Sequence, residues 1–166
     1  NTPPPPTTNP LATSTYSVVY PVDYVKNETY AYDQFGQTKL IAAISFTIPP
    51  AMATGTNLSA DSHVSIEQLP RAKKCTADIF VKDDVKAVTV VDGAVTYSVA
   101  TSSDAGAGNL YEEAVFAVAS SSPCTAVRYF VHSTQLANYP EGTVRGFDHD
   151  ALKASFDSIR HSLVLH

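Results

Sequence analysis

The sequence predicts an α+β fold, in which a largely antiparallel sheet of about six strands carries a C-terminal helix packed on one face. Strand-like segments follow one another after residue 86, with connections too short for a crossover helix, and this favours antiparallel pairing. Toward the C-terminus the apolar residues recur at helical spacing. A chain of 166 residues can bury a core of its own, so we expect one domain.

Residues 1–14 are predicted to be a disordered, Pro/Thr-rich leader or tether, and residues 15–166 the single domain. The opening run NTPPPPTTNP favours polyproline II and offers no side chains that could pack. It is typical of a spacer that remains after an export signal is removed, and a lipid tether upstream of residue 1 would fit it. An arbitrary chain end is the alternative interpretation.

The first half of the domain contains strand-like segments at residues 16–20, 39–48 and 63–67. The second of them stops at Pro49-Pro50, because proline cannot donate to a strand ladder. Residues 51–61 are predicted to form a loop. A short helix is expected over residues 71–81, where Cys75 and Ile79 lie one helical turn apart.

The second half is predicted to be a four-stranded meander followed by a helix. Its strands are expected at residues 86–91, 94–100, 110–119 and 124–133. The first two flank Asp92-Gly93, a type I′ hairpin signal, and residues 102–109 are predicted to form a flexible loop. Asp148 can cap the final helix, whose apolar stripe contains Leu152, Phe156, Ile159 and Leu163.

Composition excludes several classes of function. The hydrophobic fraction of 44% is too high for a disordered chain. A net charge of −5 without a dense basic run argues against nucleic-acid binding. The chain contains no apolar stretch of the length needed for a membrane span.

The two cysteines, Cys75 and Cys124, are predicted to form a structural disulfide. Their separation fits neither a CxxC redox motif nor a cysteine-based zinc site. A disulfide would favour an extracytoplasmic location, in the periplasm, at the cell surface or in the medium. Two separate buried thiols are the alternative.

Several segments together resemble a group of exported, lipoprotein-like bacterial proteins for which no activity is established. They are DAGAGNLYEEA at residues 104–114, the following strand with Cys124 and FVHS at residues 130–133, and YPEGTVRGFDHDALKASFDSIRHSL at residues 139–163. The closing helix is also similar, more loosely, to the PsbP-like fold. The resemblance implies an extracytoplasmic location and supplies no catalytic residues.

No catalytic, metal-binding or cofactor-binding residue is predicted. Asp61, Ser62 and His63 are the residue types of a catalytic triad, but neighbours on a strand point to opposite faces. His149 follows the helix cap, and a metal site there would need a further ligand such as His132 or Glu112.

A partner or ligand surface is predicted around Tyr111, Glu113, Arg128 and His132. Arg128 is the expected ion-pair partner of Glu113 on the neighbouring strand, and a ligand-binding carboxylate is the alternative role for Glu113. The tyrosines at 16, 20, 24, 30 and 32 are a second possible surface, if they do not simply cover the sheet.

The sequence therefore predicts an exported, non-catalytic binding or accessory domain. Its partner would be a protein or a cell-envelope component, contacted through the sheet face that the helix leaves open or through residues 51–61 and 102–109. The alternative is a small-ligand carrier or an enzyme with a pocket between helix and sheet.

Overall fold

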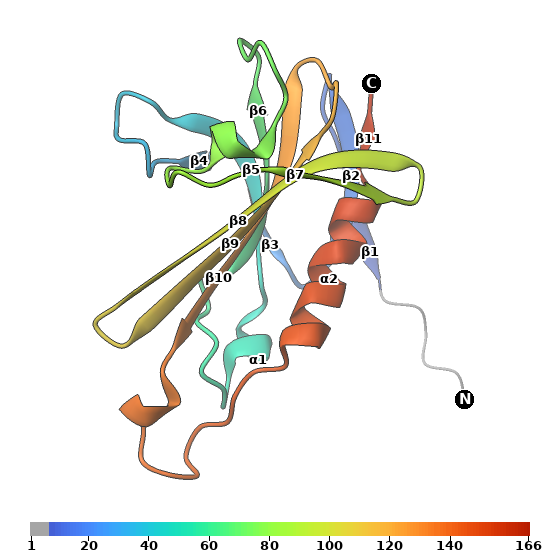
Figure 1. Cartoon of the computed structure of the whole chain (residues 1–166). Coiled ribbons are helices and arrows are strands. Elements are labelled where there is room, and N and C mark those ends of the chain that lie inside the picture. The colour runs from blue at the N-terminus through green and yellow to red at the C-terminus, as the bar shows by residue number, and fades with distance from the viewer. Residues whose placement is uncertain (1–6) are drawn as a thin grey trace.

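The computed structural model describes residues 7–166. Within this range eleven strands form two antiparallel sheets, and helices are few (Figure 1). The largely antiparallel sheet and the C-terminal helix are confirmed, but the prediction of about six strands is wrong. The chain is richer in β-structure than expected, because several short or small-residue segments also join the sheets.

The smaller sheet brings the two ends of the described chain together, in the order β1–β2–β11. Its strands are β1 (Thr8–Ala12), β2 (Tyr16–Pro21) and β11 (Val164–Leu165). Residues 8–12 were predicted to belong to the disordered leader, and this is wrong: they pair with β2, and Leu11 packs into the core. The rest of the predicted leader includes the four prolines, which lie in residues 1–6 and outside the described residues.

The larger sheet has the strand order β3–β5–β6–β10–β9–β8–β7, and β4 also pairs with β5. The strands are β3 (Val25–Asn27), β4 (Ala31–Tyr32), β5 (Ile41–Thr47), β6 (His63–Leu69), β7 (Val88–Asp92), β8 (Val95–Gly106), β9 (Asn109–Val118) and β10 (Cys124–Thr134). The predicted meander of the second half is confirmed as β7–β8–β9–β10. The β5–β6 hairpin from the first half is added to it through β10.

Residues 102–109 were predicted to form a flexible loop, and most of them are strand. Ser102 to Gly106 pair with β9, and the hairpin turns at Ala107–Gly108, where both residues have positive φ. Backbone hydrogen bonds do not depend on side-chain type, so a small-residue segment can extend a hairpin when its partner strand is long. The β7–β8 turn lies at Gly93–Ala94, one residue later than predicted, and only Gly93 has positive φ.

The helices are α1 (Pro50–Ala53), the 3₁₀ turns η1 (Ala77–Phe80) and η2 (Leu136–Asn138), and α2 (His149–His161). The predicted helix over residues 71–81 is therefore reduced to the single turn η1. The predicted cap of α2 is confirmed, since Asp148 Oδ1 accepts a hydrogen bond from the Ala151 amide at 2.9 Å. None of the helices in residues 7–166 has the length and apolar character that a membrane crossing requires.

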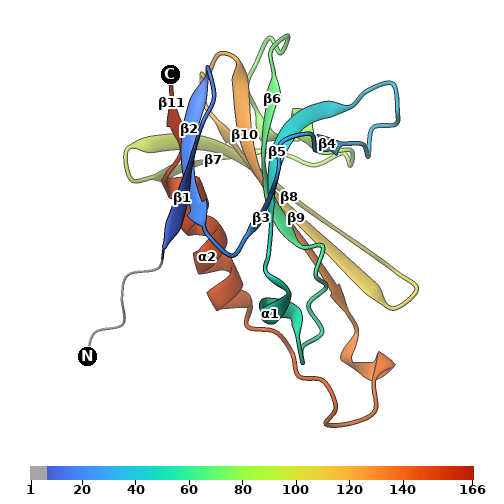
Figure 2. The same cartoon turned by 180° about the vertical axis from the view of Figure 1, so that it is seen from behind.

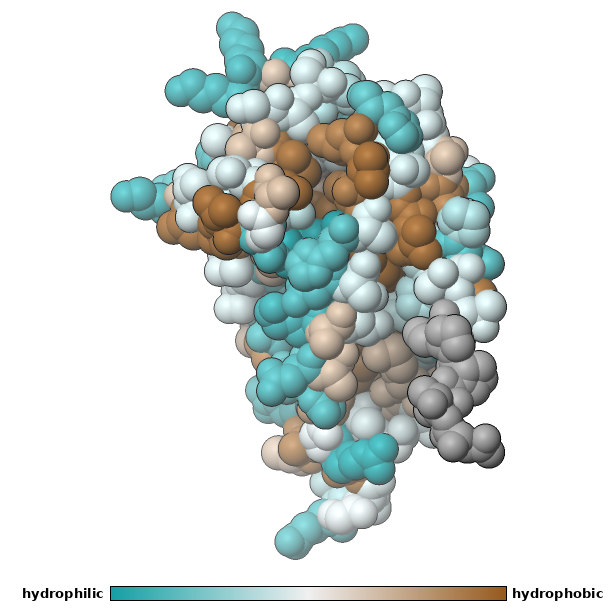
Figure 3. Space-filling model, turned by 90° about the vertical axis from the view of Figure 1, so that its right-hand side faces the viewer, coloured by the Kyte–Doolittle hydropathy of each residue, from teal (hydrophilic) through white to brown (hydrophobic). Residues whose placement is uncertain are grey.

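α2 lies against one face of the large sheet, which we call the α2 face (Figures 1 and 2). Leu152, Phe156 and Ile159 are buried there in one apolar cluster with Val127 and Tyr129 of β10. The outward side of the helix is polar, and Figure 3 shows a band of hydrophilic residues running through the middle of this side of the molecule. The helix is thus held by apolar packing along one stripe, as its sequence period predicts.

The opposite face, which we call the far face, has a smaller core of its own. Phe80 at the end of η1 and the adjacent Val81 are buried there against Ala100, Val115 and Ala126. The predicted disulfide is confirmed and links Cys75, in the segment before η1, to Cys124 at the start of β10. The segment from Cys75 to Val81 therefore covers part of the face that was expected to be open.

Candidate functional site

The register of the central strands gathers the polar and aromatic side chains of the far face into one group. On β10, Arg128, Phe130 and His132 alternate with residues of the α2 face. Phe130 lies opposite His63 on β6 and opposite Glu113 on β9. His132 lies opposite Tyr111, so the predicted surface residues of β9 and β10 are direct neighbours.

A buried ion-pair cluster lies at the centre of this group. Arg128 has no exposed surface and donates from Nε to Glu67 Oε1 at 2.6 Å and from Nη2 to Glu67 Oε2 at 2.9 Å. Its Nη1 donates to Glu113 Oε2 at 2.7 Å, which confirms the predicted pairing with Glu113. Its Nη2 also donates to the backbone carbonyl of Phe80. Because Arg128 is buried, it supports the predicted surface from below and does not form part of it.

Glu67 was missed as a member of this cluster. The one signal in the sequence is its position, because on β6 it shares the far face with Ser65 and His63. Its side chain is completely buried, and Ser65 donates to its Oε1 at 3.0 Å. A buried carboxylate requires a charged partner. The sequence does not show which strand supplies it.

Tyr32 closes the cluster on the side of β4. The Arg128 guanidinium lies 3.6 Å from the centre of its ring, and its hydroxyl donates to Glu113 Oε2 at 3.2 Å. Burial disfavours the charged guanidinium, but the hydrogen bonds and charges of Glu67 and Glu113 outweigh it and raise the pKa of Arg128 above its usual value. Arg128 therefore stays charged, and its hydrogen-bonded cluster forms the floor of the far face.

A row of partly exposed rings crosses the far face beside this floor. Tyr30 contacts His63, and His63 contacts Phe130, with ring centres 5.1 and 5.0 Å apart. Phe130 is followed by Tyr111 at 6.2 Å, and Tyr111 stacks on His132 at 4.5 Å. We call these five residues the aromatic row. It joins β6, β10 and β9 into one surface that solvent reaches.

In both histidines of the row, His63 and His132, each ring nitrogen has a hydrogen-bond partner. His63 Nε2 lies 3.2 Å from the Tyr30 hydroxyl, and its Nδ1 lies 2.7 Å from the Asp61 carbonyl. Burial lowers the pKa of His63, so this ring is neutral at pH 7. His132 Nδ1 lies 2.9 Å from the Asp61 carboxylate, and its Nε2 lies 2.9 Å from Asn109 Oδ1.

Asp61, Ser62 and His63 do not form a catalytic triad. The buried Ser62 hydroxyl donates to the backbone carbonyl of His132 at 3.2 Å, and the Asp61 carboxylate turns to the ring of His132. Asp61 and Ser62 lie just before β6, which begins at His63, so the three residues do not share one strand. The contacts of Asp61 and Ser62 fasten the start of β6 to β10.

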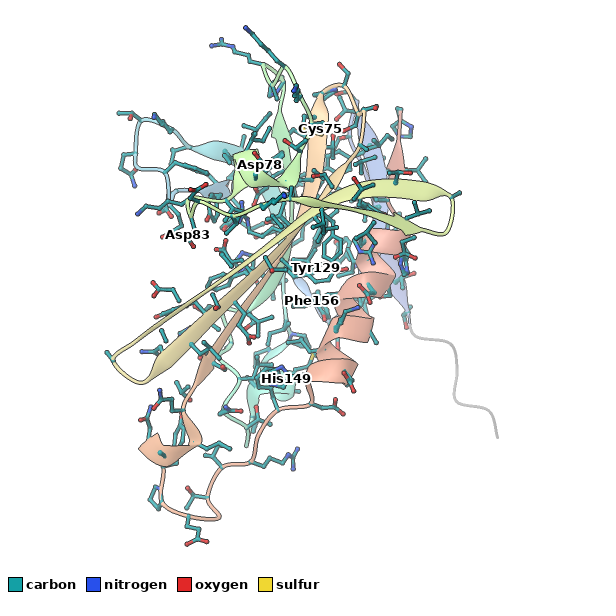
Figure 4. All side chains as sticks on the ribbon, viewed as in Figure 1. Cys75, Asp78, Asp83, Tyr129, His149 and Phe156 are labelled. Carbon is teal, nitrogen blue, oxygen red and sulfur yellow. A yellow bond between two sulfur atoms is a disulfide. The ribbon has the colours of Figure 1, made fainter. Side chains whose placement is uncertain are left out.

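A cavity of about 500 Å³ opens above the ion-pair floor. Rings line one side of it, namely Tyr30, Tyr32, His63, Tyr111 and Phe130. Its charged lining comprises Asp33, Lys82, Asp83, Asp104 and Glu113. Figure 4 shows the labelled Asp83 on the side of the strands away from α2. Tyr111 and Glu113, two of the predicted surface residues, thus line the cavity, whereas His132 ends the aromatic row beside it.

A second cavity, of about 540 Å³, lies between α2 and the sheet. Its walls are mainly apolar and include Phe116, Val131, Phe147, Leu152 and Phe156. Glu112, His149, Asp150 and Lys153 add polar groups. The ring of His149 packs on the ring of Phe147, with ring centres 3.9 Å apart. Figure 4 labels His149, the first residue of α2.

The residues considered for a metal site do not converge. His149 and Glu112 line the cavity on the α2 face, whereas His132 belongs to the far face. In the part of the chain that the structure describes, no three potential ligands come close enough to hold a metal ion.

The second surface considered, that of the five tyrosines, is smaller than expected. Four of them are buried, namely Tyr16, Tyr20, Tyr24 and Tyr32, and of the five only Tyr30 reaches solvent.

Comparisons with protein-family models, with curated proteins and with solved structures find no significant match to this chain. The resemblance to exported lipoprotein-like proteins stays a prediction. A functional interpretation of the chain therefore depends on the geometry and chemistry of its far face.

Proposed function

We propose that this chain is an exported, non-catalytic binding domain that engages a protein or cell-envelope partner through its far face. The observation that carries the proposal is the aromatic row beside the cavity of about 500 Å³. Partly exposed rings on a rigid sheet lose little side-chain entropy on binding, and aromatic residues are enriched at interface hot spots. Export is supported by the Cys75–Cys124 disulfide, because disulfides persist in oxidising compartments.

A binding role fits the chemistry of the far face better than a catalytic one. Arg128 is held between two carboxylates, and the nitrogens of His63 and His132 are occupied by neighbouring groups. A general base needs a free acceptor within reach of its substrate. Here these groups fix the shape of the surface and leave the rings and the rim carboxylates for contact.

The first test is a thermal-shift panel of metals, nucleotides, sugars, lipids and short peptides, followed by amide NMR of each ligand that raises the midpoint. A ligand present at 100 times its Kd adds about 2.7 kcal/mol, which moves the midpoint by several degrees. We expect the amide shifts to fall on β6, β9 and β10 around the aromatic row.

A matched pair of variants locates the contact. Tyr111→Leu removes a ring from the row, and we expect it to weaken binding by about tenfold, as loss of a hot-spot aromatic does. Tyr139→Leu changes an exposed tyrosine that does not line the cavity, and it should bind as the native chain does. Equal affinity of the two variants would refute the proposal.

The second candidate function is a small-ligand carrier, and the cavity between α2 and the sheet favours it. Its apolar walls fit an aliphatic chain, and its volume of about 540 Å³ lies in the range of ligand pockets. A fluorescent fatty acid tests it directly. If the cavity is the site, Val131→Trp should fill it and abolish binding, while Tyr111→Leu should leave binding unchanged.

A further inference from the structure

The cavity of the far face has an unbalanced charge. Its lining includes the carboxylates of Asp33, Asp83, Asp104 and Glu113, and one ammonium group, from Lys82. Asp33, Asp83 and Asp104 are exposed at the rim, where their charges act on whatever enters. A concave site lined by one sign of charge attracts ligands of the opposite sign.

The floor does not reverse this balance. Arg128 is paired with Glu67 as well as with Glu113, so this buried cluster carries two negative charges against one positive charge. His63 adds no charge at pH 7, because burial lowers its pKa. The cavity as a whole is therefore negative.

The rings supply the second half of a cation site. Tyr30, Tyr111 and Phe130 line the cavity and are partly exposed. The face of an aromatic ring carries partial negative charge and attracts ammonium and guanidinium groups. The same chemistry already operates in the floor, where the Arg128 guanidinium lies 3.6 Å from the centre of the Tyr32 ring and bonds to two carboxylates.

We propose that the cavity between Tyr30, Tyr111, Phe130 and the rim carboxylates binds an organic cation, an ammonium or guanidinium group. The group belongs either to a small free cation or to the side chain of a basic residue on a partner. This inference rests on the proposed function, because it names the ligand class of the same surface.

Other ligand classes fit these walls less well. An anion such as a phosphate would meet the surplus of carboxylates and be repelled. A neutral sugar can stack on rings, but its affinity would not depend on the rim charges. An organic cation uses both the rings and the carboxylates.

The experiment compares ligands that differ in charge alone. Choline is titrated against 3,3-dimethyl-1-butanol, its uncharged isostere, by amide NMR at low and high salt. A short peptide with one arginine is titrated against the same peptide with citrulline. We expect each cation to bind at least about tenfold more tightly than its neutral partner and to weaken as salt is raised. Preference for choline indicates a small free ammonium compound, and preference for the arginine peptide indicates a partner side chain.

Two neighbouring aspartates provide a matched control. Asp83 lines the cavity and Asp84 does not, although both are exposed. Asp83→Asn should weaken cation binding by about two- to fivefold, the range for a single exposed charge pair, and Asp84→Asn should change it less. Phe130→Leu, which removes a ring but no charge, should weaken it by about threefold or more.

The outcomes separate the two proposals. If neutral and charged ligands bind the aromatic row equally well, the cation proposal fails and the binding-domain proposal stands. If the cations bind but shift only amides of the α2 face, both proposals fail. If neither these ligands nor any member of the thermal-shift panel binds, the cation proposal fails and the proposal of a protein partner stands.

Discussion

Each face of the large sheet contains a buried arginine, and the two have different surroundings. On the far face, Arg128 pairs with side chains that are 0% and 13% exposed, those of Glu67 and Glu113. On the α2 face, Arg160 pairs with Asp157 and Asp92, whose side chains are 18% and 38% exposed. Asp92 can turn to water when Arg160 is lost, whereas the fully buried Glu67 cannot do so when Arg128 is lost.

The rest of each face follows the same division. On the α2 face Phe156 packs against Tyr129 with ring centres 5.3 Å apart, and the Tyr129 hydroxyl donates to the partly exposed Asp157. The far face has its charges at the centre, and its rings lie partly in solvent. Both faces have an apolar core, but the fully buried ion pair of Arg128 and Glu67 belongs to the far face.

The largest effect is expected from Arg128→Met. It leaves the fully buried Glu67 without a cation, and loss of one partner from a buried ion pair costs about 3–5 kcal/mol. Urea unfolding measures the loss. Arg160→Met is the matched control and should lower the free energy of unfolding by less, since Asp92 is partly exposed. Equal losses would mean that the two faces do not differ in this way.

Removal of the disulfide should have the next largest effect. The variant Cys75→Ala/Cys124→Ala opens a loop of 49 positions, and the expected loss is about 2–4 kcal/mol. The loop includes η1, which covers the far face. Hydrogen exchange should therefore speed up in the segment from Cys75 to Val81 and stay unchanged in α2. Equal loss of protection in α2 would contradict the separation of the two faces.

Glu112 and Glu113 are neighbours on β9 and point to opposite faces of the sheet, so they allow the two faces to be compared within one strand. Glu113→Gln removes a charge that Arg128 bonds, and we expect it to cost about 1–3 kcal/mol. Glu112→Gln changes a residue on the α2 face that is partly exposed, and its effect should stay within about 0.5 kcal/mol. Thermal unfolding of both variants checks this. A larger loss from Glu112→Gln would contradict it.

The smallest effect on the free energy of unfolding is expected from lowering the pH, through protonation of His63. Burial lowers the pKa of folded His63 below its ordinary value of 6.5, so the unfolded chain binds the proton more readily. The free energy of unfolding should therefore fall as the pH falls through 6.5, until the folded pKa is reached. His63→Gln should flatten this dependence below pH 6.5, as urea unfolding at several pH values can show. His149→Gln, on the α2 face, is the control; an unchanged slope in His63→Gln would contradict the assignment.

The features that the sequence predicted correctly depend on local period or on adjacent strands. The stripe of Leu152, Phe156 and Ile159 predicts α2, because a helix repeats every 3.6 residues. The short connections after residue 86 predict the meander, and adjacent strands within it bring Glu113 to Arg128. The Cys75–Cys124 disulfide was predicted because the chain has only two cysteines and was expected to be exported.

The tertiary structure alone decided which distant strands meet. The pairing of β6 with β10 places Glu67 against Arg128 and His63 against Phe130, and this pairing joins segments about sixty residues apart. Hydrophobic pattern shows which side chains share a face of a strand, but not which strand lies beside it. The sequence alone therefore determined α2, the meander and one pair of the ionic cluster. The cavity and the aromatic row exist only because the tertiary structure brings β6, β9 and β10 together.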